Sequence, residues 1–447
     1  MILQKKNLFV SEKIKTTLLI LFLLTIFFQV FKSVSNLYYL FLILVTFFIT
    51  LIFLVEGRIK SNKNKYTKVL FYTFYLLLAL SCIHSLYYLN TQLSSNISFN
   101  LASYVIALSR MMLMPSIVFI FAILISSSNN LSKSIKLYVI FFVLGSVSMI
   151  VQQFTGQIEL FGDLGPYRFA GLIPYNSSLG NITIYGTGIG VALLIASRHD
   201  VFSNTQKFFL ILLLLVGVFL TMQKAALINM IICFFILSIF FLNLKQLILL
   251  LLTFIFFIIG IALTLPDLSL NIISLTANTF GFELALNSKN EALYRPITER
   301  FIDRLTGRLW LSGPESLREF LLGWGLLGGG GSLGITFDTS DSGEYFTIGA
   351  PHNQYMGIFL IIGSIGLTVF LILIFSLQLD LYHKYKYYND ELAKTFFFAN
   401  LIFYINLIVA EGSLFHPYTS FIFFISIYYI IFYNSFNSNK QEQVNRL

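Results

Sequence analysis

Pro351-His352-Asn353-Gln354-Tyr355-Met356-Gly357 ends a long polar segment and opens an apolar run that continues to about Leu377. A run of this length predicts a helix that crosses a bilayer. The sequence therefore places the imidazole of His352 where a water-facing loop meets the membrane. Two interpretations remain open. His352 anchors a helix end at the level of the lipid headgroups, or it takes part in a site at the membrane surface.

The composition predicts an all-α, polytopic membrane protein. Of the 447 residues, 57% are hydrophobic and 11% are charged, and the mean hydropathy is +0.82. A soluble domain could not bury this much apolar surface, and a membrane barrel would show alternating polarity instead. Runs long enough to cross the membrane predict about twelve spans, near 16–31, 37–55, 69–89, 100–126, 137–152, 181–197, 208–222, 225–243, 246–265, 352–378, 395–410 and 418–434.

The distribution of lysines predicts the topology. With the N-terminus in the cytoplasm, most lysines fall in cytoplasmic breaks, and only Lys32, Lys224 and Lys289 do not. Positive charge is typical of cytoplasmic loops, so we expect a multi-pass membrane protein with both termini in the cytoplasm. The net charge of +9 is explained by the same lysines, and no nucleic-acid partner is predicted.

This topology divides the chain into three parts. Residues 1–265 hold spans one to nine and a first outer loop at 153–180. Residues 266–351 form a large periplasmic segment before the tenth helix, and residues 352–447 hold the last three spans and a cytoplasmic tail. The segment 266–351 contains ten of the 20 acidic residues and six basic ones. This charge content predicts a folded outer subdomain.

Two features of this segment suit the binding of an anion. Pro296 favours the first turn of a helix over 297–311, which would place Arg300, Arg304 and Arg308 on one face. The glycine-rich stretch 323–331 could take positive φ or approach a ligand closely. It lacks the Lys-Ser/Thr ending of a nucleotide-binding loop.

Cations from three segments predict a site for phosphate or carboxylate, because arginine binds such groups through two hydrogen bonds. This cation set comprises Arg168, Lys224, Arg300, Arg304, Arg308 and Arg318. Alternatively, its members pair with loop acids or lipid headgroups. Arg110 lies inside the span 100–126, where a charge costs ~3 kcal/mol or more. It lines the substrate cavity or pairs with a buried acceptor.

Two of the five histidines, His352 and His416, lie on the predicted outer side, whereas His84, His199 and His383 are interpreted as structural. A neutral imidazole can accept a proton from a sugar hydroxyl, with His352 as first candidate and His416 as second. Asn353 could orient a neighbouring backbone group or a sugar hydroxyl. Arginines can stabilise a departing diphosphate. A base beside an anion clamp predicts glycosyl transfer, with no metal site and no cofactor.

These residues resemble the O-antigen polymerase and O-antigen ligase superfamily of bacterial polysaccharide assembly. The resemblance covers roughly 165–370 and is carried by four stretches. They are Arg168 to Asn176, Thr221-Met222-Gln223-Lys224-Ala225-Ala226, Gly307-Arg308-Leu309-Trp310 before Gly323-Trp324-Gly325, and Pro351 to Met356 before Gly363-Ser364-Ile365-Gly366.

The resemblance implies a metal-independent, inverting transferase whose donor is a polyprenyl-diphosphate-linked oligosaccharide. A polymerase transfers the glycan onto another lipid-linked repeat unit, and a ligase transfers it onto a lipid A core. Such an enzyme lies among membrane lipids. The resemblance also allows two protein partners of the same pathway, a chain-length regulator and a flippase. Within this family, the catalytic residues would be His352, Arg308 and Arg168.

Two departures from the family pattern bear on this choice. Members usually have arginine where this chain has Lys224, which keeps the charge but loses the planar fork. Polymerases carry an arginine and a glycine separated by ten residues in both outer loops. Arg318 and Gly329 fit, whereas Arg168 has Leu179 at that place. Polymerase remains favoured over ligase.

Two other classes are weaker alternatives. A flippase or transporter could also have twelve spans, but it would not need an outer segment with six cations. A metal-dependent membrane glycosyltransferase usually has acidic residues in its first outer loop, and Ser33-Val34-Ser35-Asn36 has none.

Overall fold

The computed structural model describes residues 12–27, 65–92, 97–99, 101–125, 128–155, 188–197, 201–220, 224–241, 316–325, 337–339, 345–346, 353–409, 414 and 417–433, with isolated positions between 245 and 256. Its long helices are α1 (Glu12–Phe27), α3 (Lys65–Gln92), α4 (Leu101–Leu124), α5 (Ser128–Thr155), α7 (Asn204–Leu220), α8 (Lys224–Phe241), α14 (Gln354–Tyr388), α15 (Glu391–Val409) and α16 (Pro417–Tyr428), which continues as the π-helical turn η6 (Tyr429–Tyr433). Residues 188–196 are also helical.

Among the residues that the structure describes, four helices are long and apolar enough to cross a membrane: 66–85, 130–147, 354–388 and 391–408. They are compatible with a membrane protein, as the composition predicts. Further helices lie where spans are predicted, including α7 and α8 as two separate elements. The predicted span 37–55 lies outside the described residues, and 246–265 is described only at isolated positions. The total of twelve spans therefore stays a prediction.

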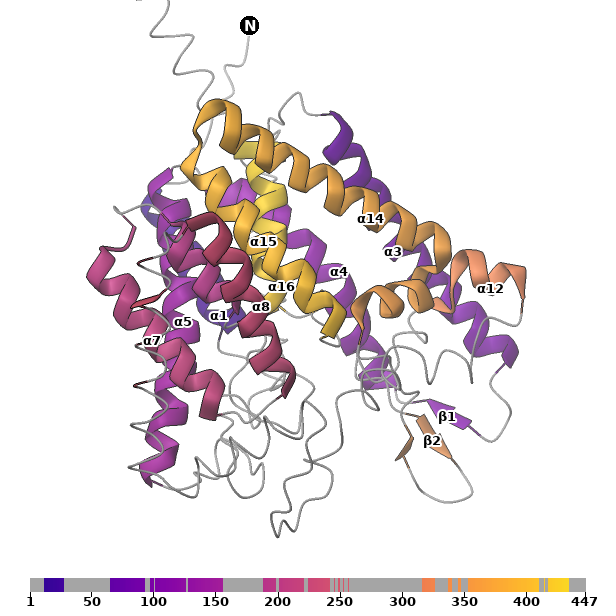
Figure 1. The fold of residues 1–447 in the computed structure, drawn as a ribbon. Coiled ribbons are helices and arrows are strands. Elements are labelled where there is room, and N and C mark those ends of the chain that lie inside the picture. Colours follow the sequence, from indigo (N-terminus) through magenta and orange to yellow (C-terminus); the bar gives the residue numbers. More distant parts are fainter. Residues whose placement is uncertain are drawn as a thin grey trace, which may run out of the picture.

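The bundle is built around α14, which packs between α3 and α15 (Figure 1). Aromatic side chains fill these contacts. The ring of Phe74 in α3 lies 5.1 Å from that of Phe370 in α14. On the other side of the bundle, Phe421 of α16 lies 5.4 Å from Phe121 of α4 and 4.5 Å from Tyr138 of α5. Phenylalanine side chains therefore contribute to the interior as well as to the exposed surface of the described helices.

Polar side chains inside the bundle pair across helices. The Asn229 amide of α8 donates to the Asn406 side chain of α15, and Asn400 of α15 donates to Ser426 of α16 at 2.6 Å. The hydroxyl of Tyr428 donates to the carbonyl of Ile125, just beyond the end of α4, at 2.7 Å. Such bonds satisfy groups that lipid could not, and they fix which helices are neighbours.

At one end of the bundle, α14 turns back into α15. Asn389 ends α14 in the left-handed conformation (φ 50°), and its N–H donates to the carbonyl of Lys384. Asp390 then caps α15, because its Oδ1 accepts from the N–H groups of Leu392 and Ala393 at 3.0 and 3.1 Å. We name this region the hairpin end. The predicted limit of the span at 378 is ten residues short of the helix end, because the fall in hydropathy there does not stop the helix.

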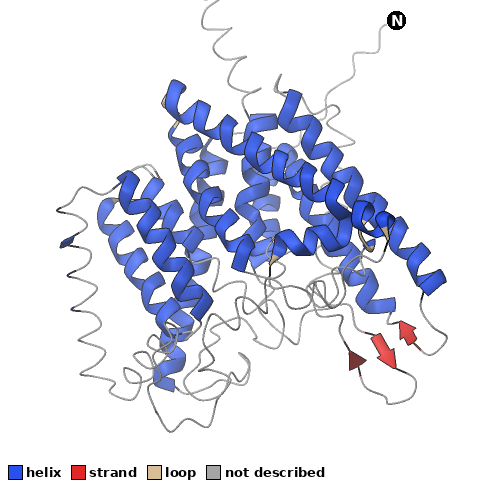
Figure 2. Cartoon of the chain, turned by 45° about the vertical axis from the view of Figure 1, so that its right-hand side comes forward, coloured by secondary structure: helices blue, strands red, loops and turns tan. Residues whose placement is uncertain are grey.

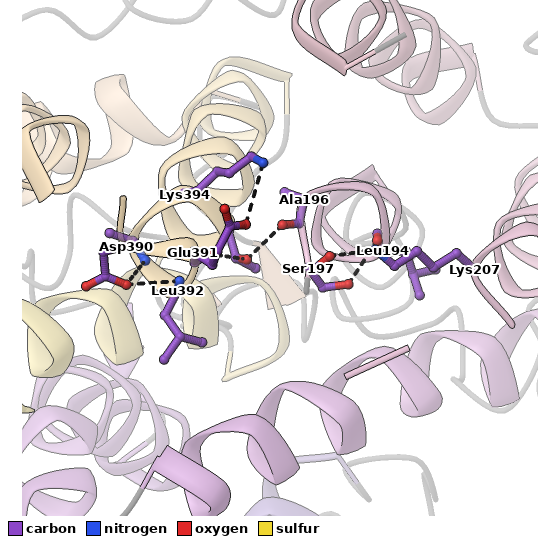
Figure 3. A network of polar contacts seen from close by, with 10 residues as sticks. Leu194, Ala196, Ser197, Lys207, Asp390, Glu391, Leu392 and Lys394 are labelled. Atoms are coloured by element: carbon purple, nitrogen blue, oxygen red, sulfur yellow. Dashed lines mark hydrogen bonds and ion pairs between the residues drawn. The ribbon is translucent and has the colours of Figure 1, made fainter. Parts of the chain in front are cut away.

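Figure 3 shows how further segments meet at the hairpin end. The ammonium of Lys207, in the first turn of α7, donates to the carbonyl of Ser197 at 2.5 Å. The hydroxyl of Thr395 in α15 lies 3.0 Å from the carbonyl of Ala196, and Lys394 forms an ion pair of 3.5 Å with Glu391. The predicted cytoplasmic residues Lys207, Lys384 and Lys394 thus share one end of the bundle. That this end faces the cytoplasm stays a prediction.

The opposite end carries a small antiparallel sheet, which the all-α prediction missed. It consists of β1 (Ile97–Phe99), β2 (Phe337–Thr339) and β3 (Tyr345–Phe346), in that order (Figure 2). Ser98 pairs with Asp338, and Phe337 pairs with Phe346. The sheet joins the connection between α3 and α4 to residues of the predicted outer segment 266–351. We name this region, together with α12 (Leu317–Leu322) and the start of α14, the sheet end.

Candidate functional site at the sheet end

The structure describes the side chains of two predicted site residues, Arg318 and Asn353. Arg110 lies in α4 and Lys224 is the first residue of α8, but the structure does not describe their side chains. The remaining predicted site residues lie outside the described residues: Arg168, Arg300, Arg304, Arg308, His352 and His416. The predicted helix over 297–311 lies outside them as well. The geometry of the candidate site is therefore built from α12, α14 and α3.

Asn353 caps the first turn of α14. Its backbone is extended (φ −130°, ψ 116°), and its side-chain oxygen lies 3.0 Å from the N–H of Tyr355 and 3.5 Å from that of Met356. Of the two roles predicted for Asn353, the structure describes orientation of the neighbouring backbone. The cap fixes the direction in which the chain enters α14, immediately after His352 in the sequence.

A capping role for Asn353 has a measurable consequence. Replacing Asn353 with alanine is expected to lower the free energy of unfolding by ~0.5–2 kcal/mol, because the first turn loses its acceptor. Asn353→Asp keeps an acceptor oxygen and should retain both thermal stability and activity. Thermal unfolding of the purified variants checks this. An aspartate variant with wild-type stability but without activity would instead indicate that the amide contacts substrate directly.

Gln354, the next residue, ties α14 to the segment that precedes α16. Its side chain is 1% exposed, and its carbonyl oxygen accepts from the N–H of Leu414 at 3.4 Å. A Cβ on Gly357 would lie 3.3 Å from the Gln354 amide nitrogen, so the small residue one turn later leaves room for the amide. The first turn of α14 thus contacts Leu414, which lies two residues before His416 in the sequence.

The helix α14 is kinked at Gly363, which has φ 68° and ψ −171°. Only glycine readily adopts this conformation. The carbonyl of Leu360 accepts the N–H of Trp324 at 2.7 Å, whereas in an unbroken helix it would accept from residue 364. The kink therefore lets a residue of the predicted outer segment bind directly to the backbone of α14.

The short helix α12 docks at this kink. Ser316 caps its start and Gly323 ends it with φ 70°. A Cβ on Gly323 would lie 2.7 Å from backbone atoms of α14, and a Cβ on Gly325 would lie 2.6 Å from the carbonyl oxygen of Ser81 in α3. The predicted positive φ is confirmed at both glycines. What they approach closely is the backbone of two helices, which differs from the ligand contact that the glycine-rich stretch suggested.

Arg318 lies on α12 and contacts His84 of α3. Its Nη2 lies 3.4 Å from Nδ1 of His84, and the Nε2 of the same ring lies 3.1 Å from the carbonyl oxygen of Gly323. A guanidinium can only donate and a carbonyl can only accept. The two bonds together therefore assign the neutral tautomer with hydrogen on Nε2. His84 thus has partners at both ends of α12.

The sequence predicted a structural role for His84 and named no partner for it, and Gln354 was not singled out. An ionisable residue inside an apolar run is a signal in itself, since such residues usually meet a polar partner. The sequence could not name that partner, because Arg318 lies 234 residues away. Gln354 gives a weaker signal, a buried amide directly after a helix cap.

Among the described residues, no three His, Cys, Asp or Glu side chains gather as a group that could hold a metal ion. Comparison of the chain with protein-family models gives no match, and neither does comparison with curated proteins. The resemblance of the motifs to the O-antigen polymerase and ligase superfamily therefore stays an expectation, and so does metal independence.

Proposed function

We propose that the chain is a polysaccharide polymerase of the outer face of the cytoplasmic membrane. It transfers a glycan from a polyprenyl-diphosphate carrier onto another lipid-linked repeat unit. The observation that supports this most is the contact between two of the motif stretches at the sheet end. Gly323-Trp324-Gly325 packs on α14 beside Gly363, and the same helix begins within the stretch Pro351 to Met356. The arrangement also brings Arg318, a member of the cation set, to this end.

In the proposed reaction, a hydroxyl of the acceptor attacks the anomeric carbon of the donor. The bond from that carbon to the diphosphate breaks as the new glycosidic bond forms, so the configuration inverts. His352 accepts the hydroxyl proton, and arginines of the cation set stabilise the charge on the departing diphosphate. The proposed reaction requires neither a metal ion nor a cofactor. Arg308 and Arg168 are the first candidates for the clamp, with Lys224, Arg300, Arg304 and Arg318 around them.

Chain-length analysis of the surface glycan in a deletion strain tests the proposal. If the protein is a polymerase, the deletion strain should carry a surface glycan of single repeat units. It should also contain lipid-linked single repeat units in the membrane. Lipid-linked polymer without attachment to a core would instead indicate the ligase reaction. An unchanged surface glycan would exclude both functions.

The anion clamp gives a second test. Replacing Arg308 or Arg168 with alanine is expected to lower transition-state stabilisation by ~2–4 kcal/mol, similar to the loss of an oxyanion donor. Glycan length and transfer rate should fall in both strains at normal protein levels. Arg295→Ala is the matched control, because it removes a guanidinium of the same outer segment that is not in the cation set. Full-length polymer from both the Arg308→Ala and Arg168→Ala strains would reject the clamp.

A further inference from the structure

His84 connects the two ends of α12 through one ring. Its Nε2–H donates to the carbonyl of Gly323, which ends the helix, and its Nδ1 accepts from Arg318 in the first turn. The ring belongs to α3, whose backbone also contacts Gly325 closely. Because α12 is docked on the kink of α14 through Trp324, the position of the Arg318 side chain is set by three elements together.

The kind of partner matters for the charge on Arg318. A carboxylate in the place of His84 would neutralise the guanidinium, whereas an imidazole that accepts through Nδ1 carries no charge. The bond to His84 uses one of the five N–H donors of a guanidinium. This contact therefore orients Arg318 while leaving its positive charge uncompensated by the ring. Arg318 is exposed, so its charge can act on a ligand at the surface of the sheet end.

We propose that His84 is a positioning residue that orients the Arg318 guanidinium toward the diphosphate of the lipid-linked donor. This inference rests on the proposed function and adds to it a contact between α3 and the cation set. His84 acts through Arg318 and does not itself touch the substrate. The same ring also donates to the carbonyl of Gly323, so the loss of His84 removes one hydrogen bond at each end of α12.

A double-mutant cycle separates this role from a general effect on folding. Arg318→Ala is expected to lower kcat/KM for the donor by ~10²-fold, as for a lost clamp donor. His84→Phe keeps an aromatic ring but has no ring nitrogen. It should lower kcat/KM ~10-fold, which corresponds to the loss of one hydrogen bond to a charged group. The kcat/KM of the double variant, which carries both His84→Phe and Arg318→Ala, should be no lower than that of Arg318→Ala alone. His84→Gln, which can both donate and accept, should recover part of the loss.

His383→Phe is the matched control, since this exposed histidine of α14 lies near the hairpin end and its ring packs on Tyr387. Its activity should equal that of the wild type. If the losses of His84→Phe and Arg318→Ala multiply in the double variant, or if either single variant is fully active, the positioning role is wrong. A wild-type protein that transfers no glycan would instead reject the proposed function.

Nitrogen NMR of the histidine ring supplies a readout that does not depend on activity. His84 should show a protonated Nε2 and an unprotonated Nδ1, and Arg318→Ala should shift the Nδ1 resonance. The tautomer with hydrogen on Nδ1, or an unchanged Nδ1 resonance in Arg318→Ala, would overturn the contact on which the inference depends.

Discussion

Replacing His352 with alanine is expected to lower the rate of glycan transfer by ~10²–10⁴-fold, the usual contribution of a general base. The reason is that alanine removes the ring nitrogen that accepts the proton of the attacking hydroxyl in the proposed reaction. Transfer from the lipid-linked donor, measured with purified protein at matched concentrations, checks the effect. His416→Ala is the comparison within the same candidate set, and its effect should be smaller.

The alternative role of His352, an anchor at the headgroup level, makes a different prediction. Glutamine or tyrosine could hold a helix end at the interface as well as histidine does. Substantial turnover by His352→Gln would therefore contradict the base role and support the anchor. Loss of turnover in His352→Gln, with normal insertion into the membrane, would support the base.

The second large effect is expected at the kink of α14. In Gly363→Ala, a non-glycine residue at φ 68° costs ~1–3 kcal/mol in backbone strain. In addition, the new Cβ would overlap the backbone of Leu321 in α12. The helix α12 should therefore leave its place on α14, which removes Arg318 from its position. We expect loss of glycan transfer together with increased protease cleavage near residues 316–325.

Gly145→Ala is the matched control for this substitution. Gly145 lies inside α5, and apart from its chain neighbours and the nearby backbone of its own helix, no atom lies within 4 Å of a Cβ built there. Alanine favours a helix interior over glycine by ~1 kcal/mol, so this variant should be fully active and at least as stable as the wild type. Wild-type activity and protease resistance in Gly363→Ala would show that the docking of α12 on the kink is not needed for function.

The long helices that the structure describes lie where the sequence predicts spans, because an apolar helix is a local property. Hydropathy over about 20 residues marks each apolar run, whatever the rest of the chain does. The end of α14 lies beyond the predicted span limit at 378 for a physical reason. Hydropathy reports the lipid boundary, while the helix continues until Asn389 adopts the left-handed conformation and ends it.

The contacts of the candidate site depend on residues that are distant in the sequence. The strands β1 to β3 have two or three residues each, too few to show the alternation that identifies a strand. The kink at Gly363 is stabilised by Trp324, and the role of His84 is set by Arg318 and Gly323. Glycine at 323 and 325 indicated a close approach, but the sequence does not say whether a ligand or a helix approaches.

The most direct measurement uses purified protein and the lipid-linked repeat unit extracted from the deletion strain, in excess EDTA. The proposed mechanism predicts products of two or more repeats on one carrier, with one polyprenyl diphosphate released per transfer. His352→Ala should give almost none under the same conditions. Failure of the wild-type protein to extend the repeat unit would contradict the polymerase assignment, and extension that EDTA abolishes would contradict metal-independent catalysis.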